Sequence, residues 1–499
     1  MMEVDVERPA GNPAREAELA SLSGRRVLVV GAARSGLAAA AWLARHQARV
    51  TLADSRDDAD VSAVARTGVA VELGPHRAAA FAPADLIVLS PGVSPWMPVV
   101  HAARLRGTPV IGELELASRF LRGRIVAVTG TKGKSTTSTL LGRMLREGGL
   151  HALVGGNLGP ALSGQIDEST EQTIHVVEAS SFQLETTERF HPWVAVCLNF
   201  SPDHLDRHVT VADYRAAKAR VFANQREHDV AVVNADDPVV MRMAAHGRAR
   251  VVPFSLHDGP EEGFGVSRAT IVHRWADGSE TPLVPLSAVR LLGAHMVADV
   301  VAATATAWLA GVPGDAITRA VEGFTGLEHA LELVAEIDGV RFVNDSKATN
   351  LEAAQRALES VPGGIVAILG GRSKGGDWRL LRDTVGARVH AIVGGRHRLQ
   401  AAVAAVPVVA VSGPRGIRGS EVAINLRLRV VPARGSYGGI GEPHGIHDLI
   451  GQPVRSARGD RVVEAIRAPV GEHDEVRGHD GCARLQQHRA AMRVDGHAL

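Results

Sequence analysis

Cysteine is nearly absent from this chain of 499 residues, and so are long hydrophobic runs. The two cysteines, Cys197 and Cys482, are too few for a disulfide framework or a thiolate metal cluster. This scarcity fits a reducing compartment, and we expect a cytoplasmic protein. No run reaches about 18 uninterrupted apolar residues, and the acidic, polar N-terminus lacks the apolar region of a signal peptide. The sequence therefore predicts no membrane insertion.

Net charge is equally scarce. The formal net charge is +1, so there is no electrostatic case for nucleic acid or a membrane surface as the main partner. Hydrophobic residues make up 45% of the chain, which is ordinary for a soluble globular protein. Because 499 residues are too many for one compact core, the length predicts two to four domains.

Lysine is also rare, because most of the 55 basic residues, counting lysine and arginine, are arginine. The lysines that remain are candidates for chemistry that needs a compact ammonium or a titratable amine. The alternative is that they are residual surface lysines, but all of them fall in segments with other functional features. The lysines are Lys132, Lys134, Lys218, Lys347 and Lys374.

Strands alternate with helices along three successive units, which predicts parallel sheets covered on both faces. The first unit has strands expected at 26–30, 48–52 and 86–89, a glycine turn at 31–36 and a helix at 37–44. The second has strands expected at 125–128, 174–177, 194–198 and 230–233, with helices at 136–147 and 294–310. The third starts near Leu331, with strands expected at 340–343 and 365–369. From about Ser412 the chain is rich in Arg, Gly and His and shows no sustained strand or helix period. We expect a disordered tail or the product of a shifted reading frame there.

A glycine-rich turn with two lysines opens the second unit. The segment V-A-V-T-G-T-K-G-K-S-T-T, residues 126–137, follows a strand and begins a helix. Gly130 and Gly133 let the backbone present N–H groups to phosphate oxygens, and the helix N-terminus favours an anion. Lys134 is expected to pair with phosphates, and Ser135 or Thr136 to reach Mg²⁺. The alternative is a bland surface turn, since Val128 stands where the strict phosphate-loop pattern has glycine.

Acidic and histidine residues follow two later strands of the same unit. Glu178 ends one strand, and Asp203, His204, Asp206 and His208 come soon after another. Carboxyl ends of parallel strands are where α/β proteins bind ligands, and Mg²⁺ prefers oxygen ligands shared with phosphates. The clustering predicts a metal–phosphate site, although a single Glu or His could simply cap a loop.

Five motifs in order then give a specific resemblance: G-T-K-G-K-S-T-T, V-V-E-A-S-S-F-Q-L-E (176–185), N-F-S-P-D-H-L-D-R-H (199–208), Y-R-A-A-K (214–218) and N-D-S-K-A-T-N (344–350). Over roughly residues 24 to 400 the chain resembles the Mur ligase family, and within it the members that add D-glutamate to UDP-N-acetylmuramoyl-L-alanine. Other Mur ligases and folylpolyglutamate synthetases share single motifs, so another carboxylate–amine ligase stays an alternative.

The resemblance implies a domain division and a fold. It implies an N-terminal extension (1–23), a Rossmann-like UDP-substrate-binding domain (24–121) and an ATP-binding central domain of phosphate-loop type (122–326). A Rossmann-like C-terminal ligase domain (327–412) is incomplete, and the atypical tail (413–499) follows. It also implies a monomer that uses ATP with Mg²⁺, and a CO₂-derived carbamate on Lys218.

Residue roles follow from the same resemblance. Lys134, His204, Lys218 and Lys347 match catalytic positions. The ATP-binding positions are Gly130, Thr131, Lys132, Gly133, Lys134, Ser135, Thr136, Asn344 and Asp345. The substrate-binding positions are Arg34, Ser35, Asp54, Arg56, Asn157, Ser181, Thr349 and Lys374. The metal ligands are Ser135, Glu178, His204 and the carbamate of Lys218. For the first unit the alternative is a glycine turn and a strand-end Asp54 with no ligand.

Three departures from the family pattern favour a different hypothesis, a paralogue that binds UDP-sugar or ATP without turnover. Met296 stands where the family has Asn near the nucleotide, and Ala330 where it has an Arg that reaches phosphate. The C-terminal S-P-A-x-A-S-x-D-x-F segment, whose Ser and Phe hold the D-glutamate carboxylate, is absent. We therefore expect weak D-glutamate binding, and we expect deletion of residues 413–499 to change little.

Overall fold

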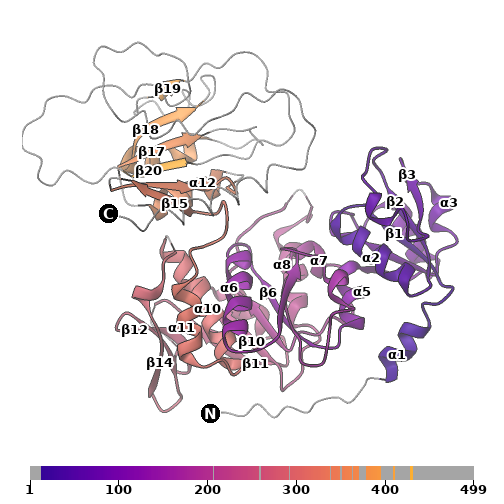
Figure 1. Ribbon diagram of the computed structural model, residues 1–499, viewed down its shortest axis with the longest axis horizontal. Helices are drawn as coiled ribbons and strands as arrows, with labels where there is room; N and C mark the ends of the chain where they lie inside the picture. The colour runs from indigo at the N-terminus through magenta and orange to yellow at the C-terminus, as the bar shows by residue number, and fades with distance from the viewer. Residues whose placement is uncertain are drawn as a thin grey trace, which may run out of the picture. The chain divides into compact units, whose positions relative to one another are not determined.

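The structure is a computed structural model that describes residues 13–205, 207–257, 260–291, 293–337, 339–348, 351–361, 364–369, 378–394, 408–410 and 427–430. In this part of the chain, helices alternate with strands that form three sheets (Figure 1). The predicted α/β architecture is confirmed, but the second and third sheets also contain antiparallel pairs that the sequence did not predict.

The first sheet is parallel, in the order β3-β2-β1-β4-β5. Its elements are α1 (Pro13–Ala20), β1 (Arg26–Val30), α2 (Arg34–Arg45), β2 (Arg49–Asp54), β3 (Ala70–Leu73), α3 (Ala78–Phe81), β4 (Leu86–Leu89), α4 (Pro98–Leu105), β5 (Val110–Gly112) and α5 (Glu113–Phe120). The apolar run of β1 forms a central strand, as a sheet covered on both faces requires. The predicted turn at 31–36 is too long, because α2 already begins at Arg34. Gly36 lies inside this helix, where a side chain would collide with the Gly31 carbonyl.

The second sheet has the order β14-β13-β12-β11-β10-β9-β6-β8-β7. It is parallel from β7 to β12, and the pairs β12–β13 and β13–β14 are antiparallel. Its strands are β6 (Arg124–Thr129), β7 (Ala152–Gly156), β8 (Ile174–Glu178), β9 (Val194–Cys197), β10 (Val230–Asn234), β11 (Arg250–Phe254), β12 (Gly263–Ser267), β13 (Thr270–Arg274) and β14 (Glu280–Pro285). Its helices are α6 (Lys134–Glu147), α7 (Ser181–Leu184), α8 (Val211–Ala219), α9 (Pro238–Ala244), α10 (Ala294–Leu309) and α11 (Gly314–Glu322). Helices α6 and α10 pack on each other and share one apolar core with the central strands.

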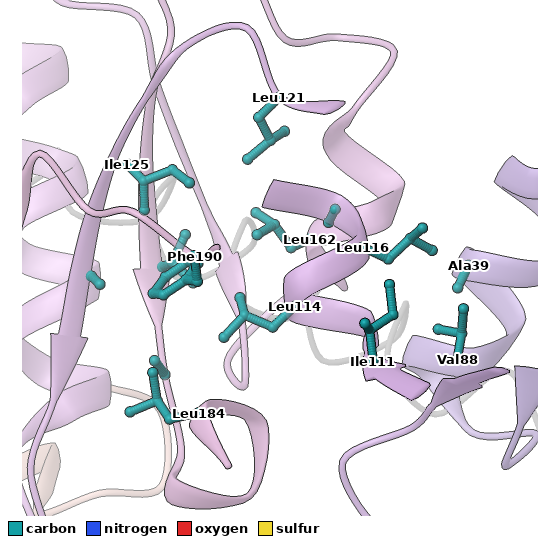
Figure 2. Close-up of a cluster of buried hydrophobic side chains, with 14 of the residues drawn as sticks. Ala39, Val88, Ile111, Leu114, Leu116, Leu121, Ile125, Leu162, Leu184 and Phe190 are labelled. Atoms are coloured by element: carbon teal, nitrogen blue, oxygen red, sulfur yellow. The ribbon is translucent and has the colours of Figure 1, made fainter. Parts of the chain in front are cut away.

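A second apolar cluster runs through α5 and joins the first sheet to the second. Figure 2 shows Leu114 and Leu116 of α5 between Ile111 and Val88 of the first sheet and Phe190 of the second unit. The buried carboxylate of Glu115 on α5 accepts the N–H groups of residues 188–190. The helix is thus fixed to the second unit by both apolar contacts and hydrogen bonds.

The third sheet has the order β15-β16-β20-β17-β18-β19. Its elements are β15 (Glu332–Ile337), β16 (Val340–Asn344), α12 (Leu351–Ser360), β17 (Ile365–Leu369), α13 (Arg382–Arg388), β18 (Val389–Gly394), β19 (Val408–Ala410) and β20 (Arg427–Val430). Strand β20 pairs antiparallel with both β16 and β17. Arg427–Val430 thus form a strand within the segment where the sequence shows no sustained strand period. The predicted domain boundaries themselves remain predictions.

Candidate active site

The turn predicted to bind phosphate lies where β6 ends and α6 begins. Gly133 precedes the first residue of α6 and has φ +83°, in the left-handed region that favours glycine. The side-chain oxygen of Asn199, from the loop after β9, accepts the N–H groups of Thr131 and Lys132 at 3.1 and 2.9 Å. The turn is therefore held in shape by a side chain from a neighbouring strand end, and it leads directly into the N-terminus of a 14-residue helix.

Lys134 is the first residue of α6, and its ammonium turns back over the loop. Its Nζ donates to the carbonyl oxygens of Gly130 and Thr131 at 3.0 and 3.1 Å. Burial lowers the pKa of this ammonium, while the carboxylate of Glu178 acts in the opposite direction. Lys134 is thus a cation at the position where a helix N-terminus attracts phosphate.

Glu178 ends β8, which pairs directly with β6, so its side chain lies beside the loop. Its two oxygens accept hydrogen bonds from Ser135 Oγ at 2.7 Å and from the amide of Asn157 at 2.6 Å. Two predicted Mg²⁺ ligands, a hydroxyl and a carboxylate, are therefore neighbours. Oxygen donors beside a phosphate loop are the set that Mg²⁺ prefers, so these residues fit the ion.

Lys218 comes from α8, and its Nζ donates to the same Gly130 carbonyl at 2.7 Å. The residue is 1% exposed. Burial, and to a lesser extent the charge of the nearby Lys134, lower the pKa of its amine to about 7. A large fraction of this amine is consequently neutral near pH 7, which is unusual for lysine.

The other predicted ligand, His204, is in the loop after β9, in the left-handed conformation with φ +55°. Its ring lies against Phe182, with ring centroids 5.0 Å apart. Ser181, the first residue of α7, bonds to the ring of His208 at 3.0 Å. Among the described side chains, no three His, Cys, Asp or Glu come together as metal ligands would. The His204 metal role stays a prediction, and Asp206 lies outside the described residues.

In the first unit, Asp54 organises the turn that follows β1. Its carboxylate accepts the N–H of Ala32 at 2.7 Å and forms an ion pair with Arg56 at 3.1 Å. Burial alone would raise its pKa, but the hydrogen bonds from Arg56 outweigh burial and lower it. Arg34 donates to the Asn157 carbonyl at 2.9 Å, and Ser35 is buried in α2. Among these predicted substrate-binding residues, Arg34 and Arg56 are both exposed, and the Arg56 side chain is 59% exposed.

The predicted residues of the third unit lie at the end of β16. The Asn344 amide contacts His329 Nδ1 at 2.8 Å, and Asp345 accepts the N–H of Leu331 at 3.0 Å. Burial raises the pKa of Asp345 to about 6. Lys347 has an exposed side chain. Thr349 and Lys374 lie outside the described residues.

One departure from the family pattern has a structural counterpart. Met296, in the first turn of α10, packs against the apolar core of the third unit. A methionine there provides an apolar contact and cannot donate the hydrogen bonds of an amide. Ala330, the second departure, has no polar side chain to offer.

Two polar residues of the site were not predicted from the sequence. Asn199 was visible as the first residue of N-F-S-P-D-H, but nothing local indicated that it holds the loop. Asp299 is buried on α10 beside Gly133. The sequence signal that could have found it is that it is the only carboxylate in a largely apolar 16-residue helix.

Comparisons with known proteins agree with this geometry. Residues 128–307 match the Mur ligase middle domain, and residues 25–112 match the N-terminal domain of the type called Mur ligase MurD-like. The chain is 48% identical over 376 residues to a UDP-N-acetylmuramoylalanine–D-glutamate ligase of Acidobacterium capsulatum, covering 74% of this chain and 82% of that protein. It is 46% identical over 388 residues to the ligase of that name from Anaeromyxobacter dehalogenans, covering 74% of this chain and 83% of that protein.

Proposed function

This chain belongs to the Mur ligase family, and we propose that it joins D-glutamate to UDP-N-acetylmuramoyl-L-alanine with cleavage of ATP, a step in making peptidoglycan precursors. The observation that carries the proposal is the hydrogen-bonded group at the start of α6. There Lys134, Ser135 and the Glu178 carboxylate meet beside a glycine turn. That group suits phosphoryl transfer, and the relatives named above carry the substrate assignment.

The first step is phosphoryl transfer to the substrate carboxylate. A carboxylate is a poor electrophile, so its oxygen first attacks the γ-phosphorus of ATP, and ADP leaves. The loop N–H groups, the α6 N-terminus and Lys134 hold the phosphates and offset the charge that develops on the transferred group. The product is an acyl phosphate, a mixed anhydride with a reactive carbonyl carbon.

The second step forms the amide bond. The amine of D-glutamate attacks the acyl carbon, inorganic phosphate departs, and the amine loses a proton. Lys347, Thr349 and Lys374 are the residues we propose for the glutamate carboxylates, with Asn344 and Asp345 near the nucleotide. Arg34, Ser35, Asp54, Arg56, Asn157 and Ser181 are the proposed contacts of the UDP-muramoyl substrate. The dicarboxylate D-glutamate needs charge-assisted hydrogen bonds, which the two lysines, Lys347 and Lys374, can donate.

Mg²⁺ fits beside the loop, where Ser135 and Glu178 would be its oxygen ligands. His204 and a carbamate on Lys218 are the further metal ligands that we propose. When bound, the ion would neutralise phosphate charge. The support for the carbamate is the buried amine of Lys218, because only a neutral amine adds CO₂. The product is an anionic oxygen donor that an arginine could not supply.

A substrate-panel assay tests the proposal. ADP release should require both UDP-N-acetylmuramoyl-L-alanine and D-glutamate, and it should not occur with dihydrofolate and L-glutamate. Release with the folate pair instead would replace the proposal with a folate polyglutamylase. Replacing D-glutamate by L-lysine or meso-diaminopimelate provides the control for amino-acid choice.

A second candidate rests on Met296 and Ala330, which remove two polar groups expected near the nucleotide. It is a protein that binds the UDP-sugar without turnover. Calorimetric binding of UDP-N-acetylmuramoyl-L-alanine, with no ADP formed over hours at micromolar enzyme, would support this candidate and contradict the ligase.

The remaining proposals concern the oligomeric state and the cellular location. A monomer and a cytoplasmic location stay predictions. In the described parts of the chain, no helix has the length and apolar character needed to cross a membrane.

A further inference from the structure

Asp299 is a buried carboxyl group that none of the steps above uses. It lies in the second turn of α10, where its neighbours in sequence are valine and alanine, and it is 4% exposed. A carboxylate is costly to bury among apolar residues unless it has a task or a partner. Its position relative to the phosphate loop suggests a task.

The carboxyl group lies directly behind the loop. Gly133 is the residue before α6, and a Cβ there would collide with both side-chain oxygens of Asp299. Helices α10 and α6 pack along each other, so this contact is part of a broad interface. The Asp299 carboxyl therefore lies against the inner side of the turn whose N–H groups are proposed to hold phosphates.

The charges around Asp299 are few. Burial raises its pKa to about 7, and Lys134 is the charged group that lowers it. On β9 the nearest ionisable group is Cys197, whose thiol is neutral because burial raises its pKa to about 12. The other charged residues of the packed elements lie at their far ends or at the surface, and the His295 side chain lies outside the described set. These residues are Arg143, Arg146 and Glu147 on α6, Arg250 on β11, and Glu322 and the paired Asp315 and Arg319 on α11.

We propose that Asp299 takes up a proton when a nucleoside triphosphate binds the loop, so that it couples ATP affinity to pH. The proposal rests on the ATP site proposed above. Two changes favour the neutral acid in the complex. Phosphate oxygens arrive on the other side of the Gly133 turn, and like charges repel strongly where water is excluded. Lys134 also turns from the loop carbonyls toward the phosphates, so its attraction for the Asp299 carboxylate weakens.

The sign of the effect follows from linkage. A ligand that raises the pKa of a group binds more tightly to the protonated protein. The apparent Kd for MgATP should therefore be flat below pH 7 and rise above it. The limiting slope is about tenfold per pH unit, because one proton is exchanged.

The test compares the full chain with Asp299→Asn, which keeps the shape and removes the titration. Isothermal calorimetry with MgATP between pH 6.5 and 8.5 gives Kd, and repetition at pH 8 in buffers of different ionisation enthalpy gives the number of protons exchanged. We expect the wild type to take up close to one proton at pH 8 and to lose affinity about tenfold between pH 7.5 and 8.5. The variant should take up at least half a proton less and show a correspondingly flatter Kd profile.

Other ionisable groups, including Lys218 and the nucleotide, contribute equally to both proteins, so the difference isolates Asp299. Equal proton uptake and parallel Kd profiles in the two proteins would overturn the role of Asp299 while leaving the ATP site intact. A wild type that binds no MgATP overturns the ATP site as well. If circular dichroism shows that Asp299→Asn does not fold, Asp299→Ala takes its place, and uptake below about 0.2 proton by the wild type alone refutes the coupling.

Discussion

Replacing Lys218 tests whether a carbamate completes the metal site. With the ordinary lysine pKa of 10.5, about 0.1% of the amine is neutral at pH 7.5. With a pKa of about 7, about three-quarters is neutral, a gain of several hundred-fold in the form that reacts with CO₂. At a fixed concentration of dissolved CO₂, the rate of carbamylation should therefore fall about tenfold per pH unit well below pH 7. The equilibrium carbamate should fall about a hundredfold per pH unit there, because the addition of CO₂ also releases a proton.

The assay is phosphate release with saturating substrates, in CO₂-depleted buffer with and without added bicarbonate. We expect Lys218→Ala to lose activity on the order of 10² to 10³-fold, as does loss of one charge-stabilising group at other active sites. Acetate or formate should restore part of it. Lys218→Arg should be equally inactive, because a guanidinium does not take up CO₂ and stays charged.

Arg215→Ala, on the exposed side of the same helix, provides the matched control and should retain activity. Carbon-13 NMR of wild-type protein under ¹³CO₂ should show one carbamate resonance that is missing in Lys218→Ala. Wild-type activity in Lys218→Ala without CO₂, or no resonance in an active wild type, would refute the reasoning.

Three further predictions concern the loop. Lys134→Ala should abolish ATP-dependent phosphate release without lowering the Tm appreciably, and near-normal turnover would contradict the assignment of the ATP site. Glu178→Gln keeps an oxygen acceptor for Ser135 but removes the negative charge. The Mg²⁺ concentration for half-maximal activity should therefore rise at least tenfold in a metal titration. An unchanged value would show that Glu178 is not a metal ligand. Gly133→Ala should lower the free energy of unfolding by about 1–3 kcal/mol in urea titrations, because its φ is +83° and a Cβ meets Asp299; an unchanged unfolding curve would contradict this contact.

The glycine-rich turn between β6 and α6 could be predicted from the sequence because its determinants are local. The apolar run 125–128, the glycines and the following helix all lie within one short segment, and β6 and α6 form where this pattern places them. Glu178 was also accessible, since a residue that ends a parallel strand lies at the edge where ligands bind. The link between Glu178 and Ser135 required the pairing of β6 with β8.

The features that escaped prediction depend on contacts between distant segments. Helix α2 can begin at Arg34 because Gly36 has no side chain to collide with the Gly31 carbonyl. The sequence pattern assigned Gly36 to a turn and therefore placed the start of this helix too late. Asn199 holds the loop across 67 to 68 positions of sequence, and no local pattern encodes that distance. Asp299 is recognisable in the sequence as a carboxylate in a largely apolar helix, but the sequence does not indicate that it contacts Gly133.

Strand β20, in the tail, is the strand with the weakest signal in the sequence. Residues 427–430 read Arg-Leu-Arg-Val, with two charges in four residues, and their strand state comes from partners on both sides. Arg427 pairs with Asn344 of β16 and with Ile368 of β17, and Val430 pairs with Arg341 and Ile365. Removing β20 would leave the edges of β16 and β17 unpaired, including the end of β16 that presents Asn344.

Two truncations separate the tail from this strand. Ending the chain after residue 433 keeps β20, whereas ending it after residue 412 removes β20. The shorter protein should lose on the order of 4 kcal/mol from the third unit, since a central strand forms hydrogen bonds along both edges. Limited proteolysis should therefore cut the shorter protein faster within residues 332–394, and its KM for D-glutamate should rise while its Kd for MgATP stays close to that of the full chain. If both truncations resist protease alike and keep equal KM values, Arg427–Val430 adds nothing to the sheet, and the prediction made from the sequence, that the whole tail is dispensable, is correct.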